Sequence, residues 1–314
     1  MTRRELIRNG AMGLAGMAMP NVIPLGLSPG RRAFKMAVIT DLHHGLAPDA
    51  ESRLGAFVEA VHKRKDIDLV LQMGDFCHPL PESGGFMRRW NEIKQPKLHV
   101  LGNHDMDHGD KDAAMKFWGM KSRYGVYEHG GFRLIVLDLN HLRKEGRLVP
   151  YANGNYFTDN ATFNLADPEQ LAWLAGELRR GSKPTVLVSH QPLGFGSPGG
   201  PLPPEQVEVF KVVQDAAREN PKGAVVVCLS GHLHVDRLEL IEGLPCLCVN
   251  SASYFWSAGM YAYSKPLYAF MEFTRDGNLK VEGVAGEFLK RPPANSAGVV
   301  GRSASITNRH VRIG

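Results

Sequence analysis

Short apolar runs recur along the chain, and most of them end at a polar or charged side chain. A short, continuous apolar run bounded by turn-forming residues is typical of a strand that is buried on both faces of a sheet. The buried strands that this pattern predicts lie at 35–40, 68–73, 97–101, 132–140, 185–189 and 224–230.

Segments with a helical pattern lie between these strands. Over 49–65 the apolar residues return every three or four positions, which places them on one face of a helix. Asp167 is a typical N-cap ahead of Pro168, and it predicts a helix over 168–180. Another helix is expected over 204–219. The first two-thirds of the chain therefore have the pattern of repeated strand–helix units.

The last third of the chain is rich in strands. The pattern changes after Gly231, where turn residues separate short runs of β-forming residues. The short strands expected there lie at 236–242, 244–250, 267–273 and 279–284. No linker-like stretch separates the two parts, so we expect a single α/β domain over residues 33–289.

Both ends of the chain are expected to lie outside this domain. Arg3 and Arg4 precede a weakly apolar stretch rich in Gly and Ala, so residues 1–32 are interpreted as a twin-arginine export signal and linker. This predicts recognition by the twin-arginine export machinery and a periplasmic or other extracytoplasmic location. A floppy basic terminus and an uncleaved anchor are the alternatives. Residues 290–314 contain no acidic residue and are expected to form a basic tail, disordered or laid across the surface.

Composition narrows the class of protein. A length of 314 residues, with 43% apolar and 22% charged, suits a globular protein with a large core, and no apolar run is long enough to span a membrane. The net charge of +5 comes from scattered basic residues without interleaved aromatics, which gives no nucleic-acid-binding signal. The four cysteines form no CxxC pair, and a disulfide among them is left open.

Residue types that bind metals stand directly after five of the expected strands. They lie in the segments Asp41-Leu42-His43, Gly74-Asp75, Gly102-Asn103-His104-Asp105, Ser189-His190 and Gly231-His232-Leu233-His234. Two residues that are two apart in an extended chain point the same way, as Asp41 and His43 would. Carboxylate, amide and imidazole ligands together suit divalent first-row metals. Each motif alone is common, but the five together predict a metal centre at one edge of the sheet.

In these five segments the chain resembles the calcineurin-like metallophosphoesterase superfamily. The resemblance spans about 41–234 and implies a four-layer α/β/β/α sandwich of two mixed sheets, with a dinuclear centre at the strand ends. The ligands that it implies for the first metal are Asp41, His43, Asp75 and His234. Those that it implies for the second metal are Asp75, which bridges the two ions, Asn103, His190 and His232.

The resemblance implies hydrolysis of a phosphate ester, either a monoester or a diester. Two divalent ions (Mn, Fe, Zn, Ni and Co all suit such ligands) carry more positive charge than Asp41 and Asp75 neutralise. The surplus attracts a phosphate ester and lowers the pKa of a shared water, so that a metal-bridging hydroxide attacks phosphorus. His104 resembles the family's catalytic His, which contacts a phosphoryl oxygen or protonates the leaving group. Asp105 is expected to hold its imidazole.

Several alternatives stay open at this point. His104 could instead only pack beneath the second metal. Purple acid phosphatases of this superfamily carry a tyrosine where this chain has His78, so a tyrosinate-to-iron charge transfer is not expected. His78 itself could line the pocket or be an ordinary loop residue. No basic residue lies inside the five motifs, which favours diesters, although the loops at 142–155 and 193–204 could supply one.

A second class of function also stays open. Some members of this fold have lost ligands and act as binding scaffolds, but all the expected ligands and His104 are present in this chain. A structural single-zinc protein fits poorly, because thiolates are absent from the five motifs. A phosphate-ester hydrolase is therefore the leading hypothesis, with a metal-poor scaffold as the alternative.

Overall fold

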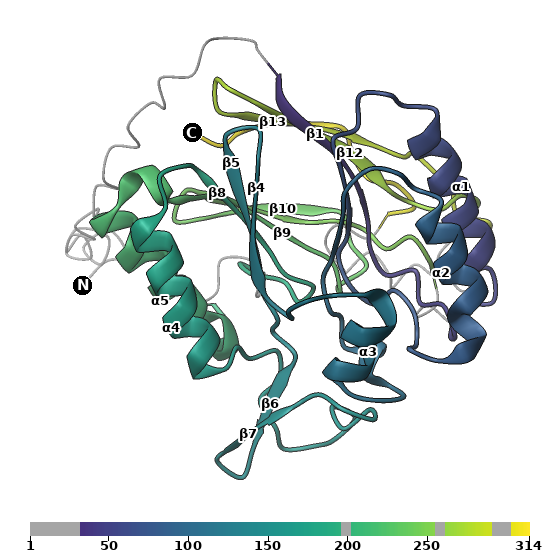
Figure 1. The fold of residues 1–314 in the computed structure, drawn as a ribbon, viewed down its shortest axis with the longest axis horizontal. Coiled ribbons are helices and arrows are strands. Elements are labelled where there is room, and N and C mark those ends of the chain that lie inside the picture. The colour runs from purple at the N-terminus through teal and green to yellow at the C-terminus, as the bar shows by residue number, and fades with distance from the viewer. Residues whose placement is uncertain (1–31, 196–201, 255–260, 291–302) are drawn as a thin grey trace, which may run out of the picture.

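The computed structural model describes residues 32–195, 202–254, 261–290 and 303–314 (Figure 1). Within them the chain forms two six-stranded sheets and one two-stranded hairpin. The expected export signal lies outside the described residues, apart from its last position. Parts of the expected loop at 193–204 and of the expected tail also lie outside them.

The first sheet is mixed. In spatial order it consists of β14 (Arg309–Arg312), β13 (Asn278–Gly283), β12 (Ala269–Thr274), β1 (Arg32–Ile39), β2 (Leu69–Gln72) and β3 (Lys97–His99). Strands β1, β2 and β3 are parallel, whereas β12, β13 and β14 add to β1 in antiparallel fashion. The strand–helix part and the strand-rich part of the sequence therefore share one sheet.

The second sheet is mixed as well. In spatial order it consists of β10 (Arg237–Ile241), β11 (Leu244–Cys248), β9 (Val225–Ser230), β8 (Thr185–Val188), β5 (Phe132–Val136) and β4 (Gly125–His129). Strands β5, β8, β9 and β11 are parallel, and the two outer strands are antiparallel to them. The separate hairpin consists of β6 (His141–Lys144) and β7 (Arg147–Pro150).

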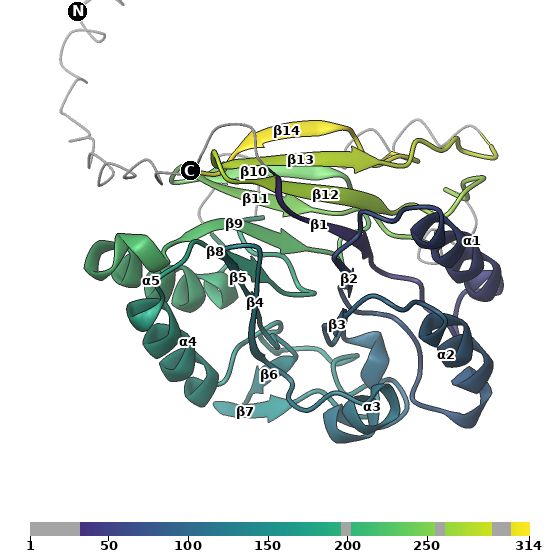
Figure 2. The same cartoon turned by 45° about the horizontal axis from the view of Figure 1, so that its top comes forward.

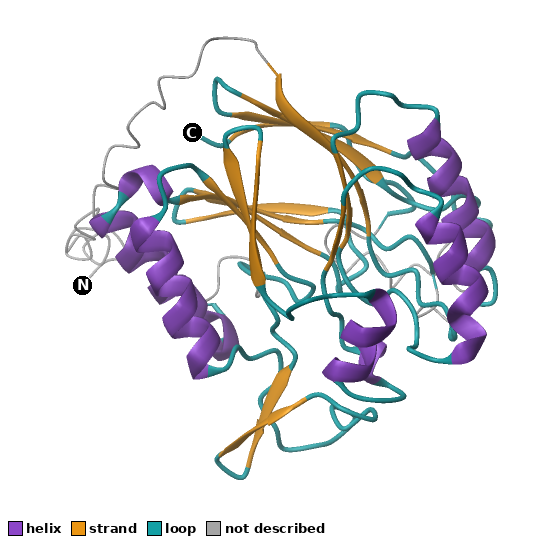
Figure 3. Cartoon of the chain, in the orientation of Figure 1, coloured by secondary structure: helices purple, strands orange, loops and turns teal. Residues whose placement is uncertain are grey.

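Helices flank the two sheets (Figure 3). They are α1 (Ala50–His62), α2 (Gly84–Asn91), α3 (Lys111–Trp118), α4 (Pro168–Arg180) and α5 (Pro204–Glu219). Short 3-10 turns lie at η1 (Pro81–Ser83), η2 (His104–Met106) and η3 (Pro221–Gly223). Figure 2 shows α1 and α2 beside the first sheet and α4 and α5 beside the second.

Three apolar clusters hold these layers together. One joins the facing surfaces of the two sheets, with Met36 of β1 and Leu134 of β5 both fully buried in it. The second packs Phe57 of α1 against the outer face of the first sheet. The third packs Leu174 of α4 against the outer face of the second sheet. Two large mixed sheets with helices packed on them agree with the α/β fold class expected from the sequence.

The described part of the C-terminal segment differs from the expected tail. Strand β14 pairs with β13 at the edge of the first sheet, and Val311 is 7% exposed. Asp236, directly before β10, accepts hydrogen bonds from both the Thr307 hydroxyl and the Arg309 guanidinium. The basic composition misled the prediction, because an edge strand buries only alternate side chains and can carry charge on the others.

Two further questions raised by the sequence concern membranes and disulfides. None of the helices in the described part of the chain is long and apolar enough to cross a membrane. The four cysteines all lie within the described residues, and all are buried free thiols. Cys228 of β9 and Cys246 of β11 lie opposite each other in the strand register, yet no disulfide joins them.

Candidate metal centre

The expected ligands follow the carboxyl ends of parallel strands in both sheets. With the strand that precedes each, they are Asp41 and His43 (β1), Asp75 (β2), Asn103 (β3), His190 (β8), and His232 and His234 (β9). Within each sheet these strands run parallel, so their carboxyl ends lie at the same edge. The site is therefore built where the ends of the two sheets meet.

The first group of ligand atoms comes from β1 and β9. The Nε2 atoms of His43 and His234 are 3.0 Å apart, and His234 Nε2 lies 3.1 Å from Asp41 Oδ1. His43 Nε2 lies 3.8 Å from the same carboxylate oxygen. Ligand atoms that share one ion at about 2.1 Å are separated by roughly these distances. These three residues could hold a metal ion.

The second group joins β2, β8 and β9. His190 Nε2 lies 3.1 Å from Asp75 Oδ2 and 3.3 Å from His232 Nδ1. Asp75 Oδ2 also lies 3.9 Å from His43 Nε2, and Asp41 Oδ1 lies 4.0 Å from His190 Nε2. The two groups are therefore neighbours, and the Asp75 carboxylate lies between them.

Asn103 provides an independent test of whether a cation fits. Its amide oxygen is buried and accepts no hydrogen bond, which is costly for a polar atom unless an unseen partner binds it. The next residue in this turn, His104, donates its backbone N–H to Asp75 Oδ1 at 2.8 Å, which brings the turn beside the second group. A neutral oxygen ligand at this position would be satisfied by a metal ion.

The backbone at the expected ligands is strained. Asp41, His43, Asp75, His232 and His234 have φ values of 55°, 53°, 49°, 68° and 51°. Residues other than glycine rarely adopt this left-handed conformation, which costs about 1 kcal/mol or more each and persists where surrounding contacts enforce it. Such outliers cluster at functional sites, and these five are among the side chains that converge.

Two motif glycines allow the strand ends to approach closely. Gly74 has φ of +100°, and a Cβ there would lie 2.4 Å from His190 Nδ1. A Cβ on Gly102 would lie 2.2 Å from Asp75 Oδ1. No larger side chain fits either position without displacing an expected ligand.

Two carboxylates and two histidines of the site have the protonation states that bind a cation. Burial alone would raise the pKa of both Asp41 and Asp75, but the surrounding histidines hold both well below the usual range. Burial lowers the pKa of His43 to about 3, although neighbouring carboxylates oppose it, and that of His232 to about 4. His190 is different: burial lowers its pKa, but the Asp75 and Asp41 carboxylates raise it to about 9.

Hydrogen bonds fix the orientation of these side chains. Thr40 Oγ1 donates to Asp41 Oδ2 at 2.6 Å, which leaves Oδ1 to face the two histidines. His190 Nδ1 lies 2.8 Å from the Met73 carbonyl oxygen, which requires the proton on Nδ1 and turns Nε2 towards Asp75. Such contacts behind a ligand set its tautomer and direction.

Asp105 has a role other than the one expected. Its carboxylate is fully buried and accepts backbone N–H groups from Asp75, Phe76, Cys77 and Gly102 at 2.7–3.2 Å. It therefore binds the turn after β2 to the turn after β3. This corrects the prediction that Asp105 holds the His104 imidazole, a contact that the structure gives to Asp107.

Asp107 and Tyr156 contact the imidazole of His104. Nδ1 of His104 lies 2.8 Å from Asp107 Oδ2 and 2.9 Å from the Tyr156 hydroxyl oxygen. That hydroxyl donates its proton to Asp107 Oδ1, so its oxygen can only accept from Nδ1. The network therefore assigns a proton to Nδ1. Although burial opposes it, hydrogen bonds from His104 and Tyr156 and the nearby His78 imidazole hold the pKa of Asp107 below its usual range.

Sequence reasoning missed both of these residues. Asp107 follows His104 by three positions, a spacing that places two side chains on one face of a helical turn and could have drawn attention to it. Tyr156 lies beyond the hairpin of β6 and β7, and nothing local in the sequence marks it. His78 lies 3.5 Å from Asp107 Oδ2, and its ring packs against His108. His78 therefore lies near Asp107, which contacts His104.

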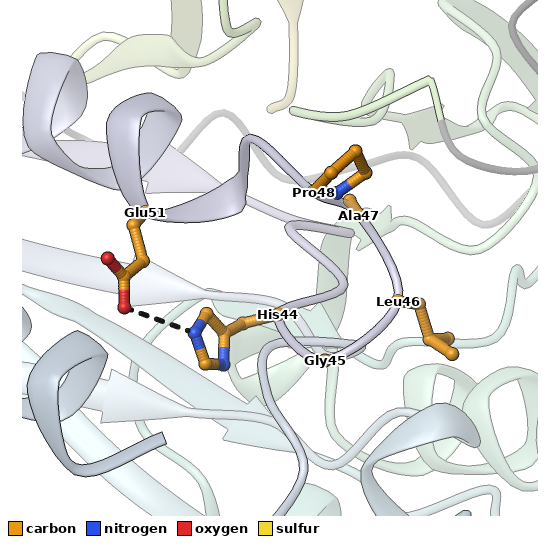
Figure 4. Close-up of a pocket in the computed structure, with 6 residues that line it drawn as sticks. All are labelled: His44, Gly45, Leu46, Ala47, Pro48 and Glu51. Carbon is orange, nitrogen blue, oxygen red and sulfur yellow. Dashed lines mark ion pairs between the residues drawn. The ribbon is translucent and has the colours of Figure 1, made fainter. Parts of the chain in front are cut away.

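A pocket of about 290 Å³ lies beside the segment that follows His43 (Figure 4). Its lining includes His44, whose Nε2 lies 3.4 Å from Glu51 Oε1 and whose Nδ1 lies 3.0 Å from Ser83 Oγ. The ring of His44 also stacks on Phe86. His44 therefore belongs to this pocket, while its neighbour His43 belongs to the converging ligands.

Comparison with known proteins identifies the family. The family model described as calcineurin-like phosphoesterase matches residues 34–236, a range that includes every expected ligand. This match covers more than half of the chain, and the chain belongs to that family. The fold and the order of the motifs agree with it.

One curated relative and two solved structures are similar to this chain. A Synechococcus protein described as a probable cyclic nucleotide phosphodiesterase is 28% identical over 218 residues, which are 63% of this chain and 72% of the relative. The structure resembles a dimetal phosphatase from Danio rerio with a TM-score of 0.62 and 13% identity, covering 90% of this chain and all of the other. It also resembles GAP50 of Plasmodium, an inner-membrane-complex anchor, with a TM-score of 0.52 and 12% identity over 90% and 89% of the two chains. At such low identity the structural likenesses concern the fold alone.

Proposed function

We propose that this protein hydrolyses phosphate esters with two divalent metal ions bound where the two sheets meet. The observation that carries the proposal is the convergence of ionised carboxylates and imidazole nitrogens at separations of 3–4 Å. Asp41, His43 and His234 would hold one ion, and His190, His232 and Asn103 the other. Asp75, which lies between the groups, would bind both.

The bound ions would supply attraction for phosphate oxygens and a lowered pKa of water. The side chains of the protein would orient the ester and donate a proton to the leaving group. His104 is the residue we assign to that proton: it lies beside the first group, with its ring 5.1 Å from that of His43. Burial lowers the pKa of His104, but Asp75 and Asp107 raise it above its usual value, which favours a proton donor.

Asp107 and Tyr156 would act as positioning residues for His104. Both residues hydrogen-bond to His104 Nδ1, so the other ring nitrogen, Nε2, would face the substrate. A histidine that is held at one nitrogen keeps one tautomer and one direction, which is what proton transfer to a fixed oxygen requires.

Phosphodiesters are the substrate class we favour. The Synechococcus relative is described as a probable cyclic nucleotide phosphodiesterase, and the five motifs contain no basic residue to bind a dianionic monoester. The Danio rerio protein is named a dimetal phosphatase, but its likeness to this chain concerns the fold alone, and a monoester stays the alternative. A cyclic nucleotide is the first diester to test.

The experiment compares wild-type protein with His104→Ala for both metal content and turnover. Each is purified, loaded with Mn or Zn, and assayed with bis(p-nitrophenyl) phosphate, p-nitrophenyl phosphate and 3′,5′-cyclic AMP. We expect two ions per chain in both proteins, preferential hydrolysis of diesters by the wild type, and a loss of about 100-fold or more in His104→Ala.

Two results would contradict the proposal. Little bound metal together with no hydrolysis of any ester would favour a binding scaffold built on the same fold. Normal turnover in His104→Ala, with its metals retained, would remove His104 from the reaction while leaving the metal centre in place.

A further inference from the structure

An exposed aromatic ring lies beside His104. Phe157 is 65% exposed, and its ring centroid lies 5.9 Å from that of His104. It also packs against Tyr156, with centroids 4.4 Å apart. A flat apolar surface therefore borders the residue that we assign to the leaving group.

The chain holds Phe157 in a fixed position. Its backbone N–H donates to the Gly154 carbonyl at 3.0 Å, and Gly154 N–H donates in turn to the Met106 carbonyl at 3.0 Å. Asn153 N–H donates to the Gly109 carbonyl at 2.7 Å, so two bonds connect this turn to the segment that carries Asp107. A Cβ on Gly154, which has φ of +65°, would lie 3.3 Å from the Phe157 ring.

Phe157 stands out among the exposed apolar residues by its type and its position. The exposed large apolar residues within the described part of the chain are Val126, Phe157, Val207, Leu233, Leu240 and Leu289. Phe157 is the one aromatic residue among them, and it borders His104. Leu233, 38% exposed, lies between the expected ligands His232 and His234. Two of the six thus lie at the rim of the metal centre, where a substrate would meet an apolar surface.

We propose that Phe157 is a specificity-determining residue that stacks on a flat aromatic or heterocyclic group in the leaving portion of the phosphate ester. The inference rests on the proposed function, because it places the leaving oxygen at His104. An aromatic side chain on a backbone that hydrogen bonds hold in place has few rotatable bonds to order when a second ring stacks on it, and such stacking tolerates many bases. An ester with a small alkyl leaving group would lack this contact.

Binding to the metal-loaded protein tests the inference without depending on turnover. Isothermal titration calorimetry compares adenosine 5′-monophosphate with ribose 5-phosphate, which carries the same phosphate and sugar but no base. We expect the nucleotide to bind about tenfold more tightly to the wild type. In Phe157→Ala this preference should disappear while the affinity for ribose 5-phosphate stays the same, and Phe157→Trp should retain it.

Leu240→Ala is the matched control, because Leu240 is 67% exposed on β10 and should leave both affinities unchanged. Equal affinities in the wild type, or an undiminished preference in Phe157→Ala, would overturn the inference. Because Phe157 is largely exposed, unchanged melting temperatures should confirm that its variants fold. Absence of hydrolysis of bis(p-nitrophenyl) phosphate by the wild type is a separate result, since it would remove the proposed function while the binding comparison still decides the role of Phe157.

Discussion

Asp105 and Asp107 lie two positions apart and hold different parts of the site. Asp105 accepts four backbone N–H groups and so keeps the turns after β2 and β3 together. Asp107 contacts His104 Nδ1 and the Tyr156 hydroxyl. One carboxylate therefore supports the backbone beneath the ligands, and the other orients a side chain that faces the substrate.

Asp107→Asn should separate orientation of His104 from metal binding. The amide keeps the shape of the carboxylate but loses its charge and one acceptor, so His104 loses its fixed tautomer. We expect kcat to fall about 10- to 100-fold with little change in KM and with full metal content. Steady-state kinetics on bis(p-nitrophenyl) phosphate, with metal analysis of the same samples, measures this.

Asp112→Asn is the control for this substitution, since Asp112 is an exposed acid in the first turn of α3. Unchanged kcat in Asp107→Asn would show that His104 needs no carboxylate partner. Loss of metal in that variant would instead make Asp107 a support of the ligands.

At the residue scale, the sequence predicted where each expected ligand would stand but misassigned the carboxylate beside His104. The ligand positions were predictable because each follows an apolar strand, which fixes its place at a sheet edge. The carboxylate that contacts His104 could not be predicted in this way. Asp105 is adjacent to His104 in sequence, but the folded turn brings the side chain of Asp107 to the imidazole. Tyr156 comes from a loop whose path depends on packing of the whole chain.

At the scale of elements, most of the buried strands were predicted, whereas several exposed strands and the helices α2 and α3 were missed. The helices at α1, α4 and α5 and the strands at β1, β2, β8 and β9 agree with the expected ranges. The strands that were not expected, β4, β6, β7 and β14, are short and carry exposed residues, so their sequences have no continuous apolar run. Strand pairing rather than local preference determines such edges.

A buried ion-pair network connects several elements. Asp138, just after β5, is fully buried and accepts from Lys111 Nζ of α3 at 2.6 Å and from Arg123 Nη1 at 3.1 Å. Arg123 also donates to Asp167, the N-cap of α4, at 2.6 Å. Burial raises the pKa of Asp138, but the opposing effect of Lys111 and the other partners is larger. The pKa of Asp138 therefore lies below its usual value.

Asp138→Asn should therefore destabilise the protein in a pH-dependent way. A carboxyl with a lowered pKa contributes stability above its ordinary pKa, near 4, and loses it as the pH falls. At pH 7 we expect a loss of about 3 kcal/mol, because Lys111 is left buried without its ionised partner. The difference from the wild type should narrow below about pH 4.

Urea unfolding from pH 7 to pH 3 measures this difference. Asp215→Asn, which removes a more exposed acid on α5, should change the free energy of unfolding little at any pH. An Asp138→Asn protein as stable as the wild type at pH 7 would contradict the account of the network.

At the scale of the whole molecule, the candidate metal centre lies where the two sheets meet. Its residues come from β1, β2 and β3 of the first sheet and from β8 and β9 of the second. The two mixed sheets were predictable from the family resemblance that the five motifs carry. The pairing of β14 was not, since it depends on an edge that only the folded sheet provides.

Removal of metal should therefore weaken the entire domain. Ions that bind the folded chain stabilise it by mass action, by about 4 kcal/mol when free metal exceeds the dissociation constant 1,000-fold. We expect a chelator to lower the melting temperature and added Mn or Zn to restore it. Asp75→Asn, which alters the residue between both groups, should remove most of the shift, and an equal melting temperature with and without metal would contradict a centre shared by the sheets.

The most direct measurement is a crystal structure of the metal-loaded protein with diffraction collected on both sides of the absorption edge of the added metal. We predict two anomalous peaks, one among Asp41, His43 and His234 and one among Asn103, His190 and His232, with the Asp75 carboxylate between them. No peak among these side chains, or a single one on a well-ordered site, would contradict a dinuclear centre.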